Sequence, residues 1–176
     1  MEQVEDRKDI LFSTPRLVCR RIDTFDLEAL EHVYGDAEAM KWVGDGQPLT
    51  HELCLKWIDV TKKNYIKRGY GMSALELKNS REVVGFCGIV HPNQQKEPEV
   101  KYAFVRKYWG LGFATEAVSG LLEYGFNELQ LSEIFSTTFE ANTLSNNVLR
   151  KNGFEQIDRR SEAGLPDVII WKISRI

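Results

Sequence analysis

Short apolar runs alternate with polar turns along most of the chain, and two longer segments repeat apolar residues at helical spacing. The run RLVCRRI (residues 16–22) has the length and composition of a strand. A helix is expected next, with Thr24 as its N-cap. Its apolar face would carry Leu27, Leu30, Val33 and Tyr34.

A second helix is predicted after the break GDGQP. Thr50 is a plausible N-cap, and Arg68 with Gly69 is expected to end the helix. The residues predicted to face the core are Leu53, Trp57 and Val60.

The middle of the chain predicts three strands and the longest helix. Residues 71–78 and 82–90 flank the polar turn NSR and read as an antiparallel hairpin. The strand EVKYAFV (residues 99–105) leads into a helical segment at residues 110–129. Its apolar residues at helical spacing are Ala114, Ala117, Val118, Leu121, Leu122 and Phe126.

The last third predicts a strand, a short helix and a final strand pair. IFSTTF (residues 134–139) precedes a helix at about 143–152, which Gly153 is placed to end in a left-handed conformation. Residues 154–158 and 167–173 are expected to pair. Because the long helix joins two central strands as a crossover, these strands should be parallel, in a mixed α/β domain.

Length and charge narrow the class of protein. A chain of 176 residues suits one domain, with a polar arm at 1–12 and the folded domain at 13–176. The net charge of −3 predicts no binding to nucleic acid, and the lack of a long apolar run or leader predicts a cytoplasmic protein without membrane contact. Three widely spaced cysteines, Cys19, Cys54 and Cys87, are expected to be reduced and mostly buried.

The segment RKYWGLGFATEA carries the most chemical information. Gly110 and Gly112 stand between a strand and the first turn of the long helix, where unpaired backbone amides can hold a pyrophosphate. An isolated pair of glycines would more often be a simple turn. A dinucleotide site is disfavoured because Thr115 replaces the third glycine, and a P-loop is disfavoured because no GK followed by Ser or Thr occurs.

Two segments together, EVKYAFVRKYWGLGFATEA and ANTLSNNVLRKNGF, resemble the GNAT superfamily of N-acetyltransferases. Within it, the NxxS pattern of Asn142 and Ser145 is similar to the ribosomal-protein N-terminal acetyltransferases of the Rim type. The resemblance implies a single three-layer α/β domain with a splayed central mixed sheet flanked by helices. It also implies acetyl transfer from acetyl-coenzyme A to a primary amine.

The same resemblance places the cofactor. Trp109 stands where the family often has a basic or amide residue, and pantetheine would enter between the strands at 99–105 and 134–139. The backbone near Ala103, Phe104 and Val105 would bind the acetyl carbonyl oxygen. The loop residues implied to bind pyrophosphate are Gly110, Leu111, Gly112, Phe113, Ala114 and Thr115.

The resemblance also suggests which residues act as catalytic groups, and it implies a reaction that requires no metal. Glu99 is the first candidate for the base that deprotonates the amine, against the alternative of a solvent-facing Glu at a strand end. His91 and Glu76 are weaker candidates.

Leu149 stands where the family usually has a tyrosine, so the departing thiolate is left with Ser145 or a water molecule as its hydrogen-bond donor. Asn142 could contact the cofactor, cap the helix, or do both.

The acceptor is the least determined part. Trp42 and Tyr70 are candidate acceptor-wall residues, with core packing as the alternative. A protein N-terminal amine or a small-molecule amine would fit, in a monomer or in a homodimer that pairs through a C-terminal edge strand. The rival function is a noncatalytic module that binds or senses acyl-coenzyme A.

Overall fold

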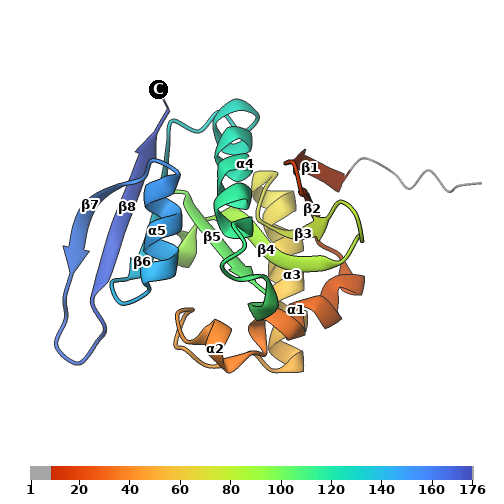
Figure 1. The fold of residues 1–176 in the computed structure, drawn as a ribbon, viewed down its shortest axis with the longest axis horizontal. Coiled ribbons are helices and arrows are strands. Elements are labelled where there is room, and N and C mark those ends of the chain that lie inside the picture. The colour runs from red at the N-terminus through yellow and green to blue at the C-terminus, as the bar shows by residue number, and fades with distance from the viewer. Residues whose placement is uncertain (1–8, 176) are drawn as a thin grey trace, which may run out of the picture.

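An eight-stranded sheet runs through residues 9–175, the part of the chain that this computed structural model describes (Figure 1). Its strand order is β1-β2-β3-β4-β5-β6-β8-β7, and among the described strands only β5 and β6 pair in parallel. This mixed sheet is unlike the parallel sheet of a dinucleotide-binding fold and agrees with the predicted class. The strands are β1 (Ile10–Ser13), β2 (Leu17–Arg21), β3 (Met72–Leu77), β4 (Val83–Val90), β5 (Glu99–Phe104), β6 (Glu133–Phe139), β7 (Glu155–Arg160) and β8 (Val168–Ser174).

Helices cover both faces of the sheet and make three layers (Figure 1). Helix α4 contacts β1, β4, β5 and β6 on one face and packs beside α5, whereas α1 and α3 lie together on the other face. The predicted crossover is confirmed, because α4 joins the parallel strands β5 and β6. The helices are α1 (Leu27–Tyr34), α2 (Ala37–Met40), α3 (His51–Arg68), α4 (Phe113–Asn127) and α5 (Thr143–Lys151).

Strand β1 was not predicted, and it lies largely inside the segment assigned to a polar arm. Ile10 pairs with Arg20, and Phe12 pairs with Cys19. The Phe12 ring packs 5.9 Å from the ring of Tyr124 on α4. Apolar contact with α4 therefore extends the domain to Ile10. The remainder of the proposed arm, residues 1–8, lies outside the described residues.

A 3-10 turn (Thr24–Asp26) precedes α1, and the cap of this turn differs from the predicted cap by one residue. Asp23, not Thr24, caps this turn, and its carboxylate accepts a hydrogen bond from the Thr24 amide at 2.6 Å. The Asp26 carboxylate accepts a hydrogen bond from the Asp23 amide at 2.9 Å, which completes a capping box.

Helix α3 has the predicted ends and a different buried face. Thr50 caps it, and Gly69 ends it at a φ of 82°. Its buried residues are Cys54, Ile58 and Thr61. Trp57 does pack inward, between Tyr34 and Phe86, whereas Leu53 and Val60 are 45% and 46% exposed. Apolar residues stand on several sides of α3, so periodicity could not choose the buried one.

The core is divided between the two faces of the sheet. One cluster gathers under α4 and α5 and contains Trp171, while the other lies under α1 and α3 and contains Phe86. All three cysteines are buried free thiols, as predicted. Within residues 9–175, no helix combines the length and apolar character needed to cross a membrane. A cytoplasmic location stays a prediction.

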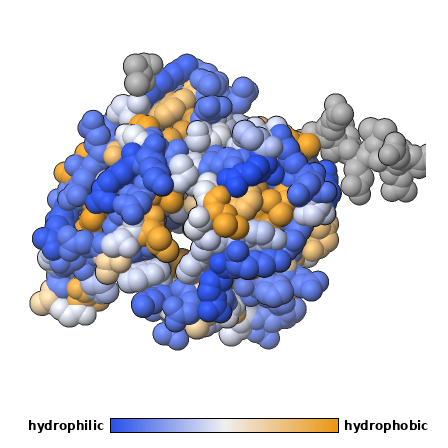
Figure 2. Space-filling view, in the orientation of Figure 1, coloured by the Kyte–Doolittle hydropathy of each residue, from blue (hydrophilic) through white to orange (hydrophobic). Residues whose placement is uncertain are grey.

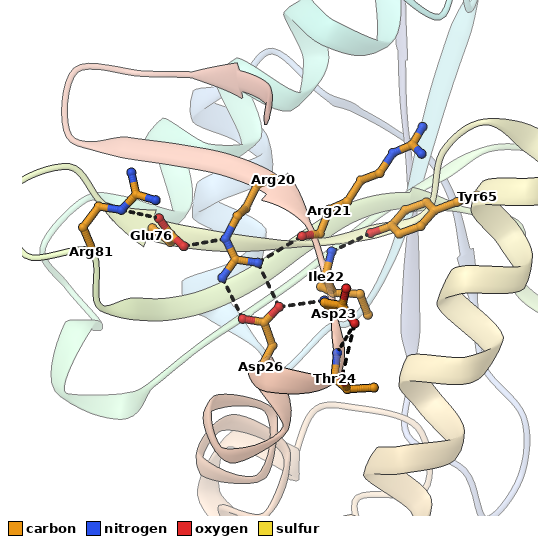
Figure 3. Close-up of polar contacts among 9 residues, drawn as sticks. All are labelled: Arg20, Arg21, Ile22, Asp23, Thr24, Asp26, Tyr65, Glu76 and Arg81. Atoms are coloured by element: carbon orange, nitrogen blue, oxygen red, sulfur yellow. Dashed lines mark hydrogen bonds and ion pairs between the residues drawn. The ribbon is translucent and has the colours of Figure 1, made fainter. Parts of the chain in front are cut away.

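A buried ionic network ties β2 and β3 to the beginning of α1 (Figure 3). The guanidinium of Arg20 donates two hydrogen bonds to Asp26, at 2.7 and 2.8 Å, and a third to Glu76. Asp26 is 2% exposed and Glu76 is 5% exposed, and Arg81 also pairs with Glu76. Burial alone would lower the pKa of Arg20, but its hydrogen bonds and charge interactions with Asp26 and Glu76 raise it.

Strand β7 forms one edge of the sheet, and all six of its residues are exposed. Its pairing with β8 shifts register between Gln156 and Asp158. A bulge and charged side chains are two devices that discourage strand addition at an edge. Dimer formation through this edge stays a prediction.

Candidate active site

The site begins where the central sheet divides. β5 and β6 share one registered pair, Glu99 with Phe135, and then diverge. The Ser136 hydroxyl still reaches the Val100 carbonyl oxygen at 3.3 Å near this closed end. Figure 2 shows the surface hollowed between the side formed by β6 and α5 and the side formed by the rest of the fold. A ligand entering between the strands would meet unpaired β5 backbone.

The two glycines of the loop adopt left-handed conformations immediately before α4. Gly110 has a φ of 73° and Gly112 a φ of 83°, and Gly112 is the N-cap. The Glu116 amide donates to the Gly112 carbonyl oxygen at 3.1 Å and is the first amide to donate within the helix, so the amides of 113–115 have no intrahelical acceptor. No side chain within residues 9–175 caps this end. The loop therefore fits the predicted role of a pyrophosphate cradle.

Trp109 anchors this loop to the end of β5. Its indole nitrogen donates to the Phe104 carbonyl oxygen at 2.8 Å. The Val105 amide donates to the Val84 carbonyl oxygen at 2.9 Å, so this amide is already used within the sheet. By alternation along β5, the Ala103 amide also faces β4, and the Phe104 amide faces the open side. Phe104 is thus the best placed of the three predicted contacts to the acetyl group.

Arg16 stabilises the same loop from the turn between β1 and β2, and the sequence did not reveal this role. Its guanidinium donates to Glu116 at 2.6 Å and to the Leu111 carbonyl oxygen at 3.0 Å, and it lies 4.1 Å from the Phe113 ring centre. The Glu116 carboxylate also accepts a hydrogen bond from the Thr14 hydroxyl at 2.6 Å. Burial would raise the pKa of Glu116, but these bonds with Thr14 and Arg16 lower it. Arg16 thereby neutralises a carboxylate close to the cradle.

Helix α5 presents Ser145 toward the divergence. Asn142 caps α5, and its side-chain oxygen accepts a hydrogen bond from the Ser145 amide at 3.2 Å. Capping by Asn142 is therefore confirmed, and its contact with a cofactor stays a prediction. Leu149 is fully buried in the core. Asn152, at the end of α5, donates to the Thr115 carbonyl oxygen at 3.3 Å and links the two helices.

Tyr102 on β5 also faces this site and was not predicted. Its hydroxyl oxygen lies 2.7 Å from the Ser145 Oγ atom, across the divergence of β5 and β6. Burial raises the pKa of Tyr102, and the hydrogen bond with Ser145 lowers it by a smaller amount. The net pKa is about 12. The two residues are 43 positions apart, so no local pattern could connect them.

Glu99 lies at the closed end of the divergence and is 7% exposed, so the solvent-facing alternative is wrong. Its carboxylate pairs with the Lys101 ammonium at 2.6 Å and accepts hydrogen bonds from Gln95 at 2.9 Å and Thr137 at 3.3 Å. Burial raises the pKa of Glu99, but together these three partners lower it below its ordinary value. The carboxylate is therefore ionised at neutral pH, as a base must be.

The other candidate bases are engaged elsewhere. Glu76 belongs to the Arg20 network described above. The His91 Nε2 atom lies 2.8 Å from the Tyr70 hydroxyl, and its Nδ1 atom lies 3.0 Å from the Gln95 carbonyl oxygen. Because Gln95 also donates to Glu99, His91 and Tyr70 are connected to Glu99 through one residue.

The two predicted acceptor-wall residues do not lie together. The Trp42 ring packs at a tilt of 48° against Phe139, the last residue of β6, with ring centres 6.2 Å apart. Tyr70 instead lines a separate cavity of about 410 Å³ beside the end of α3. The structure therefore brings Trp42, but not Tyr70, to the end of β6.

Comparisons with known proteins agree with this geometry. A family model described as the acetyltransferase (GNAT) domain matches residues 16–155. The uncharacterized N-acetyltransferase YoaA of Bacillus subtilis is 29% identical over 148 residues, which cover 83% of each protein. A GNAT-family acetyltransferase structure from Bacillus anthracis has a TM-score of 0.80 at 25% identity, covering 94% of this chain and 98% of that one.

RimL, a ribosomal L7/L12 alpha-N-protein acetyltransferase solved with coenzyme A, has a TM-score of 0.79 at 18% identity. The match covers 94% of this chain and 98% of RimL. At this identity the likeness is one of fold.

Proposed function

Because the chain belongs to the GNAT acetyltransferase family, we propose that it transfers an acetyl group to a primary amine by direct attack within a ternary complex. One observation carries this proposal most strongly. The free amides at the start of α4 follow β5 through the loop that Trp109 hydrogen-bonds to Phe104, and the pairing of β5 with β6 stops after Glu99. This juxtaposition fits a long ligand that has an anionic part and a neutral arm.

Acetyl-coenzyme A fits that description, and it supplies an activated acetyl thioester. The amides at 113–115 and the Gly112 backbone would hold its pyrophosphate, without a basic side chain in direct contact. The Phe104 amide would hydrogen-bond the acetyl oxygen and stabilise the negative charge that develops there.

Glu99 is proposed as the base, acting directly or through one water molecule. An amine must lose a proton to form an amide, and an ionised carboxylate can accept it. Glu99, Lys101 and Ala103 alternate along β5 with Val100, Tyr102 and Phe104, so the two sets face opposite sides of the sheet. The amine would therefore approach from the side of α1 and α3, opposite Tyr102 and Ser145.

The acceptor is proposed to be a protein N-terminal amine or a small-molecule amine. The NxxS pattern of Asn142 and Ser145 favours testing protein N-termini first. Trp42, packed against Phe139, is the aromatic residue best placed to contact this acceptor.

A noncatalytic acyl-coenzyme A module is the weaker proposal. It would need the cradle but not a buried, ionised carboxylate at the closed end of the divergence. The matched relative is also named an N-acetyltransferase.

The direct test combines ligand binding with an amine screen. At about 100 times its dissociation constant, acetyl-coenzyme A should stabilise the protein by about 2.7 kcal/mol in thermal unfolding, while NAD should not. Peptides with free or blocked N-termini, polyamines and amino sugars would then be screened for acetylation by mass spectrometry. Binding without transfer to any amine would favour the noncatalytic module, and no binding would contradict the assignment of the cradle.

The ion pair between Glu99 and Lys101 predicts a specific pH dependence. Since the pKa of Glu99 is lowered, activity should be lost only as pH falls below the ordinary range of a glutamate. In Lys101→Met the burial remains and the nearby positive charge is lost, so the acidic limb should move to higher pH by about one unit. The measurement is kcat/KM for the amine as a function of pH.

Lys62→Met is the matched control for this experiment. Lys62, on α3, is similarly exposed and pairs with Asp23 at 2.5 Å, and neither residue lies on β5 or on a strand that pairs with it. The acidic limb should not move in this variant. An unchanged limb in Lys101→Met would exclude Glu99 as the group that titrates.

A further inference from the structure

Tyr102 and Ser145 form a hydrogen-bonded pair that bridges β5 and α5. The Tyr102 hydroxyl oxygen is 2.7 Å from Ser145 Oγ and 3.3 Å from the Ser145 carbonyl oxygen. Leu149, one turn further along α5, is fully buried and has no side-chain donor. We propose that Tyr102 is a positioning residue that turns the Ser145 hydroxyl hydrogen toward the sulfur of bound acetyl-coenzyme A. This inference rests on the proposed function.

The direction of the hydrogen bond decides what Ser145 can do. A serine hydroxyl has one hydrogen, and if it points at Tyr102 it is not available to a ligand. Either hydroxyl can donate in this pair, and the Tyr102 hydrogen has two acceptors within reach, Ser145 Oγ at 2.7 Å and the Ser145 carbonyl oxygen at 3.3 Å. Because a phenol is a better donor than an aliphatic alcohol and Oγ is the nearer acceptor, we assign the donor role to Tyr102 and the acceptor role to Ser145 Oγ. The Ser145 hydrogen is then free, while the Asn142 side chain holds the backbone of this turn through the Ser145 amide.

The chemistry requires charge stabilisation on sulfur. Acetyl transfer breaks the bond between the carbonyl carbon and sulfur, and the bonding electron pair stays on sulfur. A hydrogen bond from Ser145 would stabilise that charge. Because the pKa of Tyr102 is about 12, its phenol remains protonated and continues to donate at neutral pH. No proton leaves Tyr102, and the released thiolate takes its proton from water.

A binding experiment tests this role without turnover. The thiol of bound coenzyme A would be titrated by thiolate ultraviolet absorbance, with the complex of desulfo-coenzyme A as the spectral reference. In the wild type the thiol should titrate below about 8.5, the ordinary value for a thiol. Tyr102→Phe and Ser145→Ala should each raise this pKa by about one unit, and the double variant should raise it no further.

Kinetics give the second measurement. Tyr102→Phe should lower kcat for thiol release from acetyl-coenzyme A about tenfold, the value of one lost hydrogen bond, with KM for acetyl-coenzyme A unchanged within about twofold. In the Ser145→Ala background the same change should have little effect, because Tyr102 acts through Ser145.

Tyr124→Phe is the control, since it removes a phenol oxygen from a half-buried tyrosine on α4 and should leave both measurements unchanged. The inference would be overturned if Tyr102→Phe and Ser145→Ala lowered kcat independently, so that their effects multiplied in the double variant. It would also be overturned if the thiol pKa were unchanged in Tyr102→Phe. If the wild type acetylates no amine, the proposed function fails. The titration then still decides the role of Tyr102.

Discussion

Gly112→Glu is expected to raise the dissociation constant of acetyl-coenzyme A at least about 100-fold, or about 2.7 kcal/mol. The substitution places a carboxylate at the N-cap of α4, where the free amides would hold a pyrophosphate. Two like charges about 4 Å apart near a protein surface repel by roughly 4 kcal/mol before screening by salt. A side chain here would also lie close to Arg16, since an ideal Cβ atom at Gly112 is 3.4 Å from its guanidinium. Isothermal titration calorimetry measures the change.

Gly164→Glu separates this effect from backbone strain. Gly164 has a φ of 82°, almost equal to the 83° of Gly112, and it lies in the turn between β7 and β8. The control therefore adds the same side chain at nearly the same positive φ, and acetyl-coenzyme A affinity should not change. Affinity of Gly112→Glu within about threefold of the Gly164→Glu value would contradict the assignment of the cradle.

Arg20→Leu is expected to lower the free energy of unfolding by about 3–5 kcal/mol. Asp26 would remain buried without its guanidinium partner, and Glu76 would keep only the exposed Arg81. For a domain of this size, the thermal midpoint should fall by roughly 10 °C. Urea unfolding at neutral pH measures the free energy directly.

Arg159→Leu is the matched control for charge removal. Arg159 also pairs with two carboxylates, Glu140 at 2.7 Å and Asp167 at 2.8 Å, but its side chain is 50% exposed. Solvent and salt screen such pairs, so the midpoint should hardly change. Equal losses in the two variants would mean that burial of the Arg20 network contributes little. In Arg20→Lys, the charge remains without the forked geometry, and an intermediate loss is expected.

The sequence predicted most elements because their signals are local. The loop before α4, the Thr50 cap and the Gly153 stop each depend on a few adjacent residues. By contrast, β1 is short and follows a polar segment, so its pairing with β2 was not foreseen. The face of α3 was predicted only in part, because Tyr34 and Phe86, distant in sequence, determine which side is buried.

In the candidate site, too, the sequence predicted the positions of local motifs but not the residues that contact them from elsewhere in the chain. The positions of the cradle, Ser145 and Glu99 follow from motifs and strand ends. The partners that determine their chemistry come from elsewhere in the chain. Arg16 meets Glu116 across 100 positions, and Tyr102 meets Ser145 across 43. Burial of Glu99 depends on the packed sheet, which a sequence pattern does not describe.

The single registered pair between β5 and β6 implies that the sheet can behave as two cooperative folding units. β6 and β8 share seven registered pairs, from Glu133 with Ser174 to Phe139 with Val168, so they should open together with β7. Amide hydrogens of β6 and β8 should then exchange with solvent as a group, faster than those of β3 and β4. A ligand bound to both units should slow this exchange, whereas a ligand confined to one unit should not.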